Sequence, residues 1–217
     1  AYDIPLRLVG SEMCIRDSST IAEAGAFIKT KDELDIPNIQ FHYAPAMIVD
    51  HGRTLLWGTG MSCHSCLLRP KSLGEVTLAS ADPFADPLID PKFLSHPDDM
   101  KDMIDGYKVM MRVLGSEPFS KYITEHTQRP IDINNDADIE QAMREGADTV
   151  YHPVGTCKMG DDDMSVVDSR LKVHKVNGLR VVDASIMPTI VGGNTNAPTI
   201  MIGEKASDMI LEDWNIH

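Results

Sequence analysis

Apolar and polar residues alternate in three stretches of the first half of the chain, and each stretch predicts a strand. Residues 39–43 alternate with period two, the pattern of a half-buried strand, and residues 74–80 repeat it. Residues 63–68 show a similar alternation after the Gly-x-Gly at 58–60. Cys63 stands where a dinucleotide-binding fingerprint would place its third glycine, so we interpret the Gly-x-Gly as a turn.

Apolar residues at helical spacing predict amphipathic helices over residues 97–114 and 136–146. Pro97 opens the first helix, and Asp98 and Asp99 complement the positive end of its dipole. The methionine-rich stripe of this helix is typical of core packing rather than of a ligand site.

The order of these elements predicts an α+β fold with a mostly antiparallel sheet, because strands come first and helices then mix with them. Three Asp-Pro pairs between residues 82 and 91 keep the connecting segment extended, since proline is excluded from helix interiors. A length of 217 residues corresponds to one large domain or two small ones.

The charge balance narrows the possible partners. The formal net charge is −13, and an acidic surface repels phosphate, so we expect neither nucleic acid nor an anionic membrane surface as a partner. No apolar run approaches the roughly 20 residues of a membrane span, and no signal-peptide core is recognised near the first residue. We therefore expect a cytoplasmic protein without an integral membrane segment, and peripheral attachment to the inner membrane stays open.

The first residues do not fit the rest of the chain. Residues 8–18 resemble a translated sequencing adapter, so residues 1–18 are set aside as an artefactual or non-native N-terminus in the prediction of the fold. On this interpretation the native sequence begins near Ser19, and we expect the product of a truncated gene whose N-terminal half is missing.

Cysteines and aspartates raise the question of a metal or redox site. Cys63 and Cys66 form a C-x-x-C pair. A structural zinc site needs two further ligands at matching spacing, and the sequence has no second pair. A redox pair would normally open a helix, whereas this stretch runs directly into Arg69-Pro70. Buried or half-buried strand cysteines are the better interpretation. The acidic run 161–163 lacks the alternating ligands and the glycine of a calcium loop and indicates a solvated turn. No metal is predicted.

The most informative stretch for chemistry covers residues 149–160. It places His152 directly before Pro153, whose ring favours an extended conformation of the preceding residue. The imidazole is therefore expected on a rigid arm, which suits a base.

The chain after residue 178 predicts a second set of site elements. Residues 179–183 predict a short apolar strand, and the Gly-Gly pair at 192–193 predicts a turn. Asn196 is the expected N-cap of a helix over 199–213, with Pro198 in its first turn. The open N–H groups and the dipole of this helix favour an anion at its start.

Three motifs in this order resemble the C-terminal part of the glucose-methanol-choline (GMC) flavin oxidoreductases, above all choline dehydrogenases and FAD-dependent dehydrogenases of aliphatic alcohols. They are His-Pro-Val-Gly-Thr-Cys at 152–157, Val-Asp-Ala-Ser-Ile-Met-Pro at 182–188 and Asn-x-Asn-Ala-Pro-Thr at 194–199. The resemblance implies FAD as the cofactor, although the family's FAD-binding fingerprint does not occur in the sequence. It also implies a substrate-domain portion over residues 19–150, followed by the catalytic histidine and the C-terminal part of the FAD-binding domain over 151–217.

The resemblance assigns a role to individual residues. A histidine that matches His152 takes the hydroxyl proton of the alcohol in this family, and histidine suits that task because its ordinary pKa lies near working pH. The second position of the catalytic pair falls on Asn194, 42 residues later, and an amide can donate to the substrate oxygen but cannot take its proton. Val150 is expected in the substrate pocket because it lies two residues before His152. Segments that touch the flavin match Asp183, Ala184, Asn196, Ala197, Pro198 and Thr199.

The sequence thus predicts the C-terminal fragment of an enzyme that oxidises a primary alcohol to an aldehyde by hydride transfer to FAD. Choline and aliphatic alcohols stay open as substrates, and a quinone or another compound stays open as the electron acceptor. The alternative is a non-catalytic fragment or binding module that cannot hold FAD alone.

Overall fold

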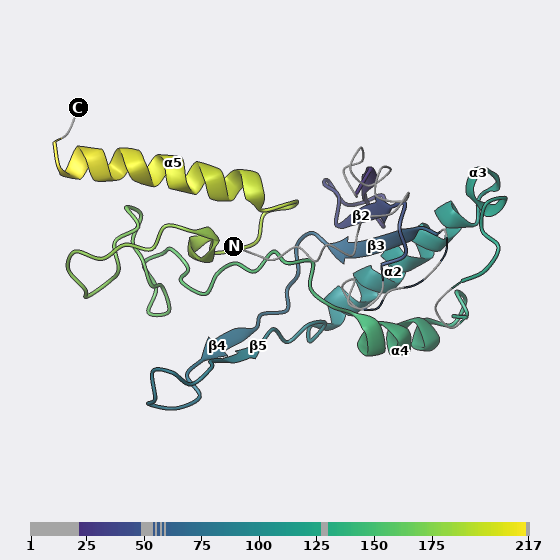
Figure 1. The fold of residues 1–217 in the computed structure, drawn as a ribbon, viewed down its shortest axis with the longest axis horizontal. Helices are drawn as coiled ribbons and strands as arrows, with labels where there is room; N and C mark the ends of the chain where they lie inside the picture. The colour runs from purple at the N-terminus through teal and green to yellow at the C-terminus, as the bar shows by residue number, and fades with distance from the viewer. Residues whose placement is uncertain are drawn as a thin grey trace. The chain divides into compact units, whose positions relative to one another are not determined.

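The fold is described by a computed structural model, which covers residues 22–48, 54, 56, 58, 60–126 and 130–215 (Figure 1). The chain divides into two compact units. Among the described residues, unit 1 comprises those within 22–66 and 106–125, and unit 2 comprises those within 67–105 and 126–215. The non-native segment expected at 1–18 lies outside the described residues. The domain boundary expected at residue 150 falls within unit 2 and stays a prediction.

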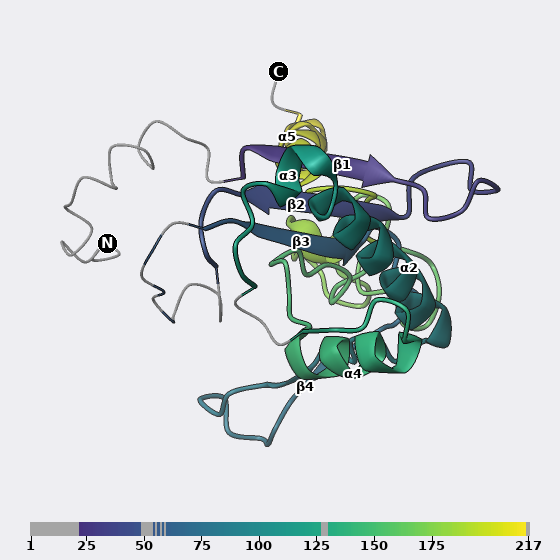
Figure 2. The same ribbon diagram turned by 90° about the vertical axis from the view of Figure 1, so that its right-hand side faces the viewer.

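Unit 1 is built on a three-stranded sheet with the strand order β1-β2-β3 (Figure 2). The strands are β1 (Ala24–Ile28), β2 (Ile39–Ala44) and β3 (Ser62–Leu67). β1 and β2 pair antiparallel, with Ala24 opposite Tyr43 and Ile28 opposite Ile39. The strands predicted over residues 39–43 and 63–68 are therefore confirmed with small shifts at their ends.

Helix α2 (Pro97–Leu114) contributes residues to both units, and its part from Gly106 onward belongs to unit 1. Ile39 of β2 is fully buried and lies so close to Gly106 that a Cβ there would meet three of its carbons at 3.0–3.3 Å. The short helix α3 (Glu117–Ser120) follows. The predicted helix 97–114 and the core role of its apolar stripe are confirmed, since its buried residues include Met100, Ile104 and Met110.

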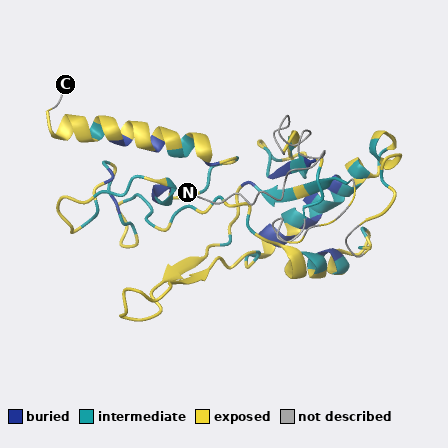
Figure 3. Ribbon diagram, in the orientation of Figure 1, coloured by how far each residue is buried: buried dark blue, intermediate teal, exposed yellow. Residues whose placement is uncertain are grey.

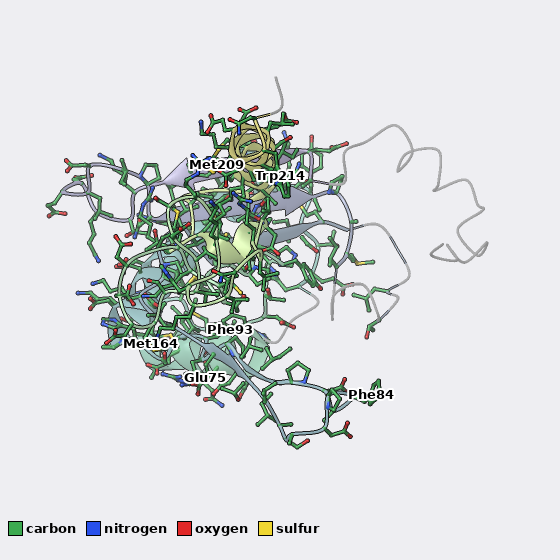
Figure 4. All side chains as sticks on the ribbon, turned by 90° about the vertical axis from the view of Figure 1, so that its left-hand side faces the viewer. Glu75, Phe84, Phe93, Met164, Met209 and Trp214 are labelled. Atoms are coloured by element: carbon green, nitrogen blue, oxygen red, sulfur yellow. The ribbon has the colours of Figure 1, made fainter. Side chains whose placement is uncertain are left out.

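Unit 2 contains an exposed hairpin. β4 (Glu75–Thr77) pairs antiparallel with β5 (Leu88–Asp90), and every residue of both strands is exposed (Figure 3). Phe84 projects from the loop between them and is 93% exposed (Figure 4). The strand predicted over 74–80 is shorter than expected, because the chain leaves the pairing after Thr77 and enters the Asp-Pro segment.

Two longer helices complete unit 2. α4 (Asp136–Gly146) matches the predicted helix, and the side chain of its N-cap Asn135 accepts a hydrogen bond from the N–H of Ala137. α5 (Asn196–Asp213) begins three residues earlier than the predicted 199–213. The expected cap was wrong as well, because Asn196 is already helical and Thr195 occupies the N-cap position.

The core of unit 2 joins α5 to a short 3-10 helix, η3 (Ala184–Ile186). The strand predicted over 179–183 does not form, because the backbone pairs there only through an isolated bridge between Lys172 and Arg180. Asp183 then caps η3, and its carboxylate accepts a hydrogen bond from the N–H of Ser185. The buried core residues are Val167, Leu171, Ile186, Met187, Ile202 and Ala206.

Ion pairs hold the C-terminal end of α5. Asp213 lies 2.8 Å from Nη2 of Arg170 and 2.6 Å from Nζ of Lys172, and it also pairs with Arg180. Hydrogen bonds from Lys172 and Arg180 hold the pKa of the Asp213 carboxyl well below its usual range. The charge of these partners therefore anchors the helix to the preceding loops.

The architecture is α+β with antiparallel sheets, as predicted. Cys63 and Cys66 are half-buried on β3, where a separation of three residues points their side chains to opposite faces. Burial raises the pKa of both thiols. Within the described ranges, no group of three or more His, Cys, Asp or Glu side chains could hold a metal ion. None of the described helices is long and apolar enough to cross a membrane.

Candidate active site

The first element of the site is the stretch that carries His152. It follows Tyr151, which has a φ of 63° in the left-handed region, and leads into Gly155 with a φ of 86°. The N–H of Cys157 donates to the carbonyl of Ser185 at 3.0 Å, and the N–H of Met159 donates to that of Ile186 at 2.8 Å. Two backbone hydrogen bonds therefore fix this stretch to η3, and His152 is half-buried beside it.

The second element is the predicted turn at 192–193, which presents Asn194. The N–H of Gly193 donates to the carbonyl of Val191 at 2.8 Å. The guanidinium of Arg69 lies against Gly192, where a Cβ would come within 2.2 Å of Nη2. Residue 192 must therefore be glycine as long as the Arg69 guanidinium stays where it is.

The third element is the start of α5. The carbonyl of Thr195 accepts the first helical hydrogen bond from the N–H of Thr199 at 3.0 Å. An N-cap threonine ordinarily accepts a bond from a first-turn N–H through its side chain. The Thr195 side chain makes no such bond, so the first-turn N–H groups of Asn196 and Ala197 receive no cap from it.

These elements bring the expected catalytic pair together. Nδ2 of Asn194 lies 3.2 Å from Nε2 of His152, and Oγ1 of Thr195 lies 2.8 Å from Nδ1 of the same ring. Both nitrogens of the imidazole therefore have partners from two consecutive residues. An amide nitrogen only donates, so with Nδ2 of Asn194 facing the ring a neutral imidazole accepts at Nε2 and carries its proton on Nδ1.

The arrangement suits proton abstraction from a hydroxyl group. An oxygen that replaces the direct contact, at the usual hydrogen-bond distance of about 2.9 Å from both Nε2 and Nδ2, could donate its proton to His152 and accept from Asn194. The amide cannot take a proton, so the two side chains have unequal roles. Val150 and Tyr151 are exposed next to His152 and could contact a ligand there.

The residues expected at the flavin divide into two groups. Asp183 uses its carboxylate locally on Ser185, so Asp183 and the adjacent Ala184 would contact a cofactor mainly through their backbone. Residues 196–199 form the first turn of α5. Thr199 turns its hydroxyl to the carbonyl of Thr195 at 2.7 Å, and Pro198 has no N–H to donate.

Thr195 was missed by the sequence reasoning, which assigned the cap to Asn196. The only signal was its position directly after Asn194. A threonine before a helix is usually explained as a cap, and the side chain's direction depends on the fold.

Comparison with known proteins gives the family context. The GMC oxidoreductase family model matches residues 70–203. An alcohol dehydrogenase [acceptor] from Pseudomonas putida is 47% identical over 194 residues, which are 89% of this chain and 35% of that protein. An oxygen-dependent choline dehydrogenase from Klebsiella pneumoniae is 43% identical over 188 residues, 87% of this chain and 34% of that protein.

Solved structures agree with this placement. Pyridoxine 4-oxidase from Mesorbium loti superposes with a TM-score of 0.76 at 25% identity, covering 87% of this chain and 37% of that structure. Formate oxidase from Aspergillus oryzae RIB40 superposes with a TM-score of 0.78 at 29% identity, covering 85% and 33%. The chain spans about a third of the length of the curated relatives it matches. It belongs to the GMC oxidoreductase family, whose members use FAD, and corresponds to the C-terminal region of these enzymes.

Proposed function

We propose that this chain is the C-terminal part of an FAD-dependent enzyme that oxidises a primary alcohol, choline or an aliphatic alcohol, to an aldehyde. The observation that carries the proposal is the contact between Nε2 of His152 and Nδ2 of Asn194 at 3.2 Å. It joins a proton acceptor to a hydrogen-bond donor at one point, as the oxidation of a hydroxyl group requires. The electron acceptor of the complete enzyme is a quinone or another compound.

His152 acts as the base in this proposal. Its Nε2 accepts the hydroxyl proton of the alcohol, while Nδ1 keeps its own proton toward Thr195. Asn194 donates to the same oxygen as negative charge develops on it. This hydrogen bond stabilises the transition state more than it stabilises the bound alcohol. Val150, exposed beside the base, lines the substrate pocket.

The residues present fit an FAD group at the start of α5. The N–H groups of Asn196 and Ala197 receive no cap from Thr195, and a helix N-terminus favours electron-rich or anionic acceptors. Asp183, Ala184, Pro198 and Thr199 complete the proposed cofactor contacts, mostly by backbone. FAD, when bound, supplies the hydride acceptor that amino-acid side chains lack.

The test uses the complete enzyme and follows flavin reduction by an alcohol in anaerobic stopped-flow experiments. His152→Ala should slow reduction by roughly 10²-fold or more, the scale of general base catalysis. Asn194→Ala should slow it by roughly 10²- to 10³-fold, as for the loss of an oxyanion-type donor, and Asn194→His should recover much of the rate because it restores a ring donor. The exposed His126 offers a matched control, since His126→Ala removes an imidazole elsewhere. Reduction at the wild-type rate in His152→Ala would refute the proposal.

A further inference from the structure

Thr195 is a buried hydroxyl that does not serve the helix it precedes. Its side chain belongs to a residue only 8% exposed, and it makes no capping hydrogen bond to α5. Its Oγ1 instead lies 2.8 Å from Nδ1 of His152. An N-cap hydroxyl that bonds a first-turn N–H stabilises a protein by about 1 kcal/mol. Because the Thr195 hydroxyl points to His152 instead, α5 lacks this stabilisation. The hydroxyl is used on the imidazole.

With Nδ2 of Asn194 facing Nε2, the two contacts of His152 match one tautomer. Nδ2 of Asn194 donates, so Nε2 must offer its lone pair, and a neutral imidazole then carries its single proton on Nδ1. Oγ1 of Thr195 accepts that proton's hydrogen bond. In the opposite arrangement, the hydroxyl donates to Nδ1 and the amide oxygen of Asn194 accepts from Nε2. That arrangement places a proton where the base must accept one.

We propose that Thr195 is a positioning residue that holds His152 in the Nδ1-protonated tautomer and fixes its ring plane. The inference rests on the proposed function of His152 as the base. When Nε2 gains the hydroxyl proton, the ring becomes a cation, and the bond from Nδ1 to Oγ1 becomes charge-assisted and stronger. Thr195 therefore acts more on the rate of the proton-abstraction step than on the affinity for the alcohol.

The proximity of Thr195 and Asn194 in sequence gives this role a structural basis. Residue 195 is the N-cap of α5, whose buried Ile202 and Ala206 belong to the core of unit 2, and residue 194 directly precedes it. The stretch that carries His152 is tied to η3 by backbone bonds, and η3 packs on α5. The His152 ring therefore lies between the stretch tied to η3 and the start of α5, which belong to one packed unit. The Thr195 hydroxyl can fix the orientation of this ring.

The experiment compares three substitutions in the complete enzyme by anaerobic flavin reduction, with rates expressed per bound flavin. Thr195→Val keeps the shape and removes the hydroxyl, and we expect saturating reduction to slow roughly 10- to 100-fold, the range for a lost hydrogen bond to a charged group. The alcohol concentration that half-saturates the rate should change less than about 3-fold. Thr195→Ser restores the hydroxyl and should stay within about 3-fold of wild type. If Thr195→Val loses flavin, Thr195→Ala replaces it as the variant without the hydroxyl.

A matched control is Thr77→Val, the same chemical change on the exposed strand β4. Wild-type rates per flavin in Thr195→Val or Thr195→Ala would overturn the inference, as would equal slowing in Thr195→Ser. Loss of flavin from both apolar variants while Thr195→Ser keeps it would also overturn it, because the hydroxyl would then support the fold. His152→Ala, measured in parallel, separates the two proposals. Wild-type flavin reduction in His152→Ala would refute the proposed role of His152 as the base. Slow reduction in His152→Ala together with wild-type reduction in Thr195→Val would refute only the role of Thr195.

Discussion

Replacing Ile202 by alanine tests whether α5 is held by the core of unit 2. Ile202 is 7% exposed and packs in one cluster with Val167, Leu171 and Ile186. The substitution removes three buried carbons, worth about 2.5 kcal/mol at about 0.8 kcal/mol per methylene, and leaves a cavity that adds to the cost. We therefore expect a loss of roughly 2.5 to 5 kcal/mol in the free energy of unfolding.

Ile200 provides the matched control, because it lies on the same helix and is 58% exposed. Ile200→Ala removes little packing and gains a few tenths of a kcal/mol of helix propensity, so its effect should stay within about 0.5 kcal/mol. Urea denaturation of the 217-residue chain, followed by far-ultraviolet circular dichroism, measures both variants. Equal midpoints for the two variants would refute the assignment of Ile202 to the core and of this face of α5 to packing.

Two further predictions concern the C-terminal end of α5 and the turn before Asn194. Asp213→Asn should lower the midpoint of thermal unfolding at pH 7, where the carboxylate pairs with Arg170, Lys172 and Arg180. Because pairing lowers the folded-state pKa of Asp213, its stabilisation is present above the ordinary aspartate pKa of about 3.9 and is lost as the pH falls below it. A difference between wild type and variant that persists unchanged at pH 2 would contradict this. Gly192→Ala should cost roughly 1 kcal/mol because its Cβ would displace the Arg69 guanidinium. The cost should largely vanish in an Arg69→Ala background, and additive effects in such a double-mutant cycle would contradict the contact.

Much of the local structure could be predicted from the sequence. The helices at 97–114 and 136–146 follow from residues that lie next to one another, namely apolar side chains at helical spacing and, for the first helix, an opening proline and two aspartates. The strands near 39–43 and 63–68 follow from alternation. The order of three motifs also indicated the family, which residues 70–203 match.

Long-range contacts decided what the sequence left open or led us to predict wrongly. Residues 179–183 alternate little and pair only through an isolated bridge, so no local signal distinguishes this loop from a strand. The cap of α5 depends on where the Thr195 hydroxyl points, and the imidazole that it contacts, His152, lies 43 residues away along the chain. Similarly, the 3.2 Å contact between His152 and Asn194 requires η3 and α5 to pack together. The sequence determined which side chains carry the proposed chemistry, whereas the tertiary structure decided their distances and which side chains meet the two nitrogens of the imidazole, because both depend on contacts between segments far apart in the chain.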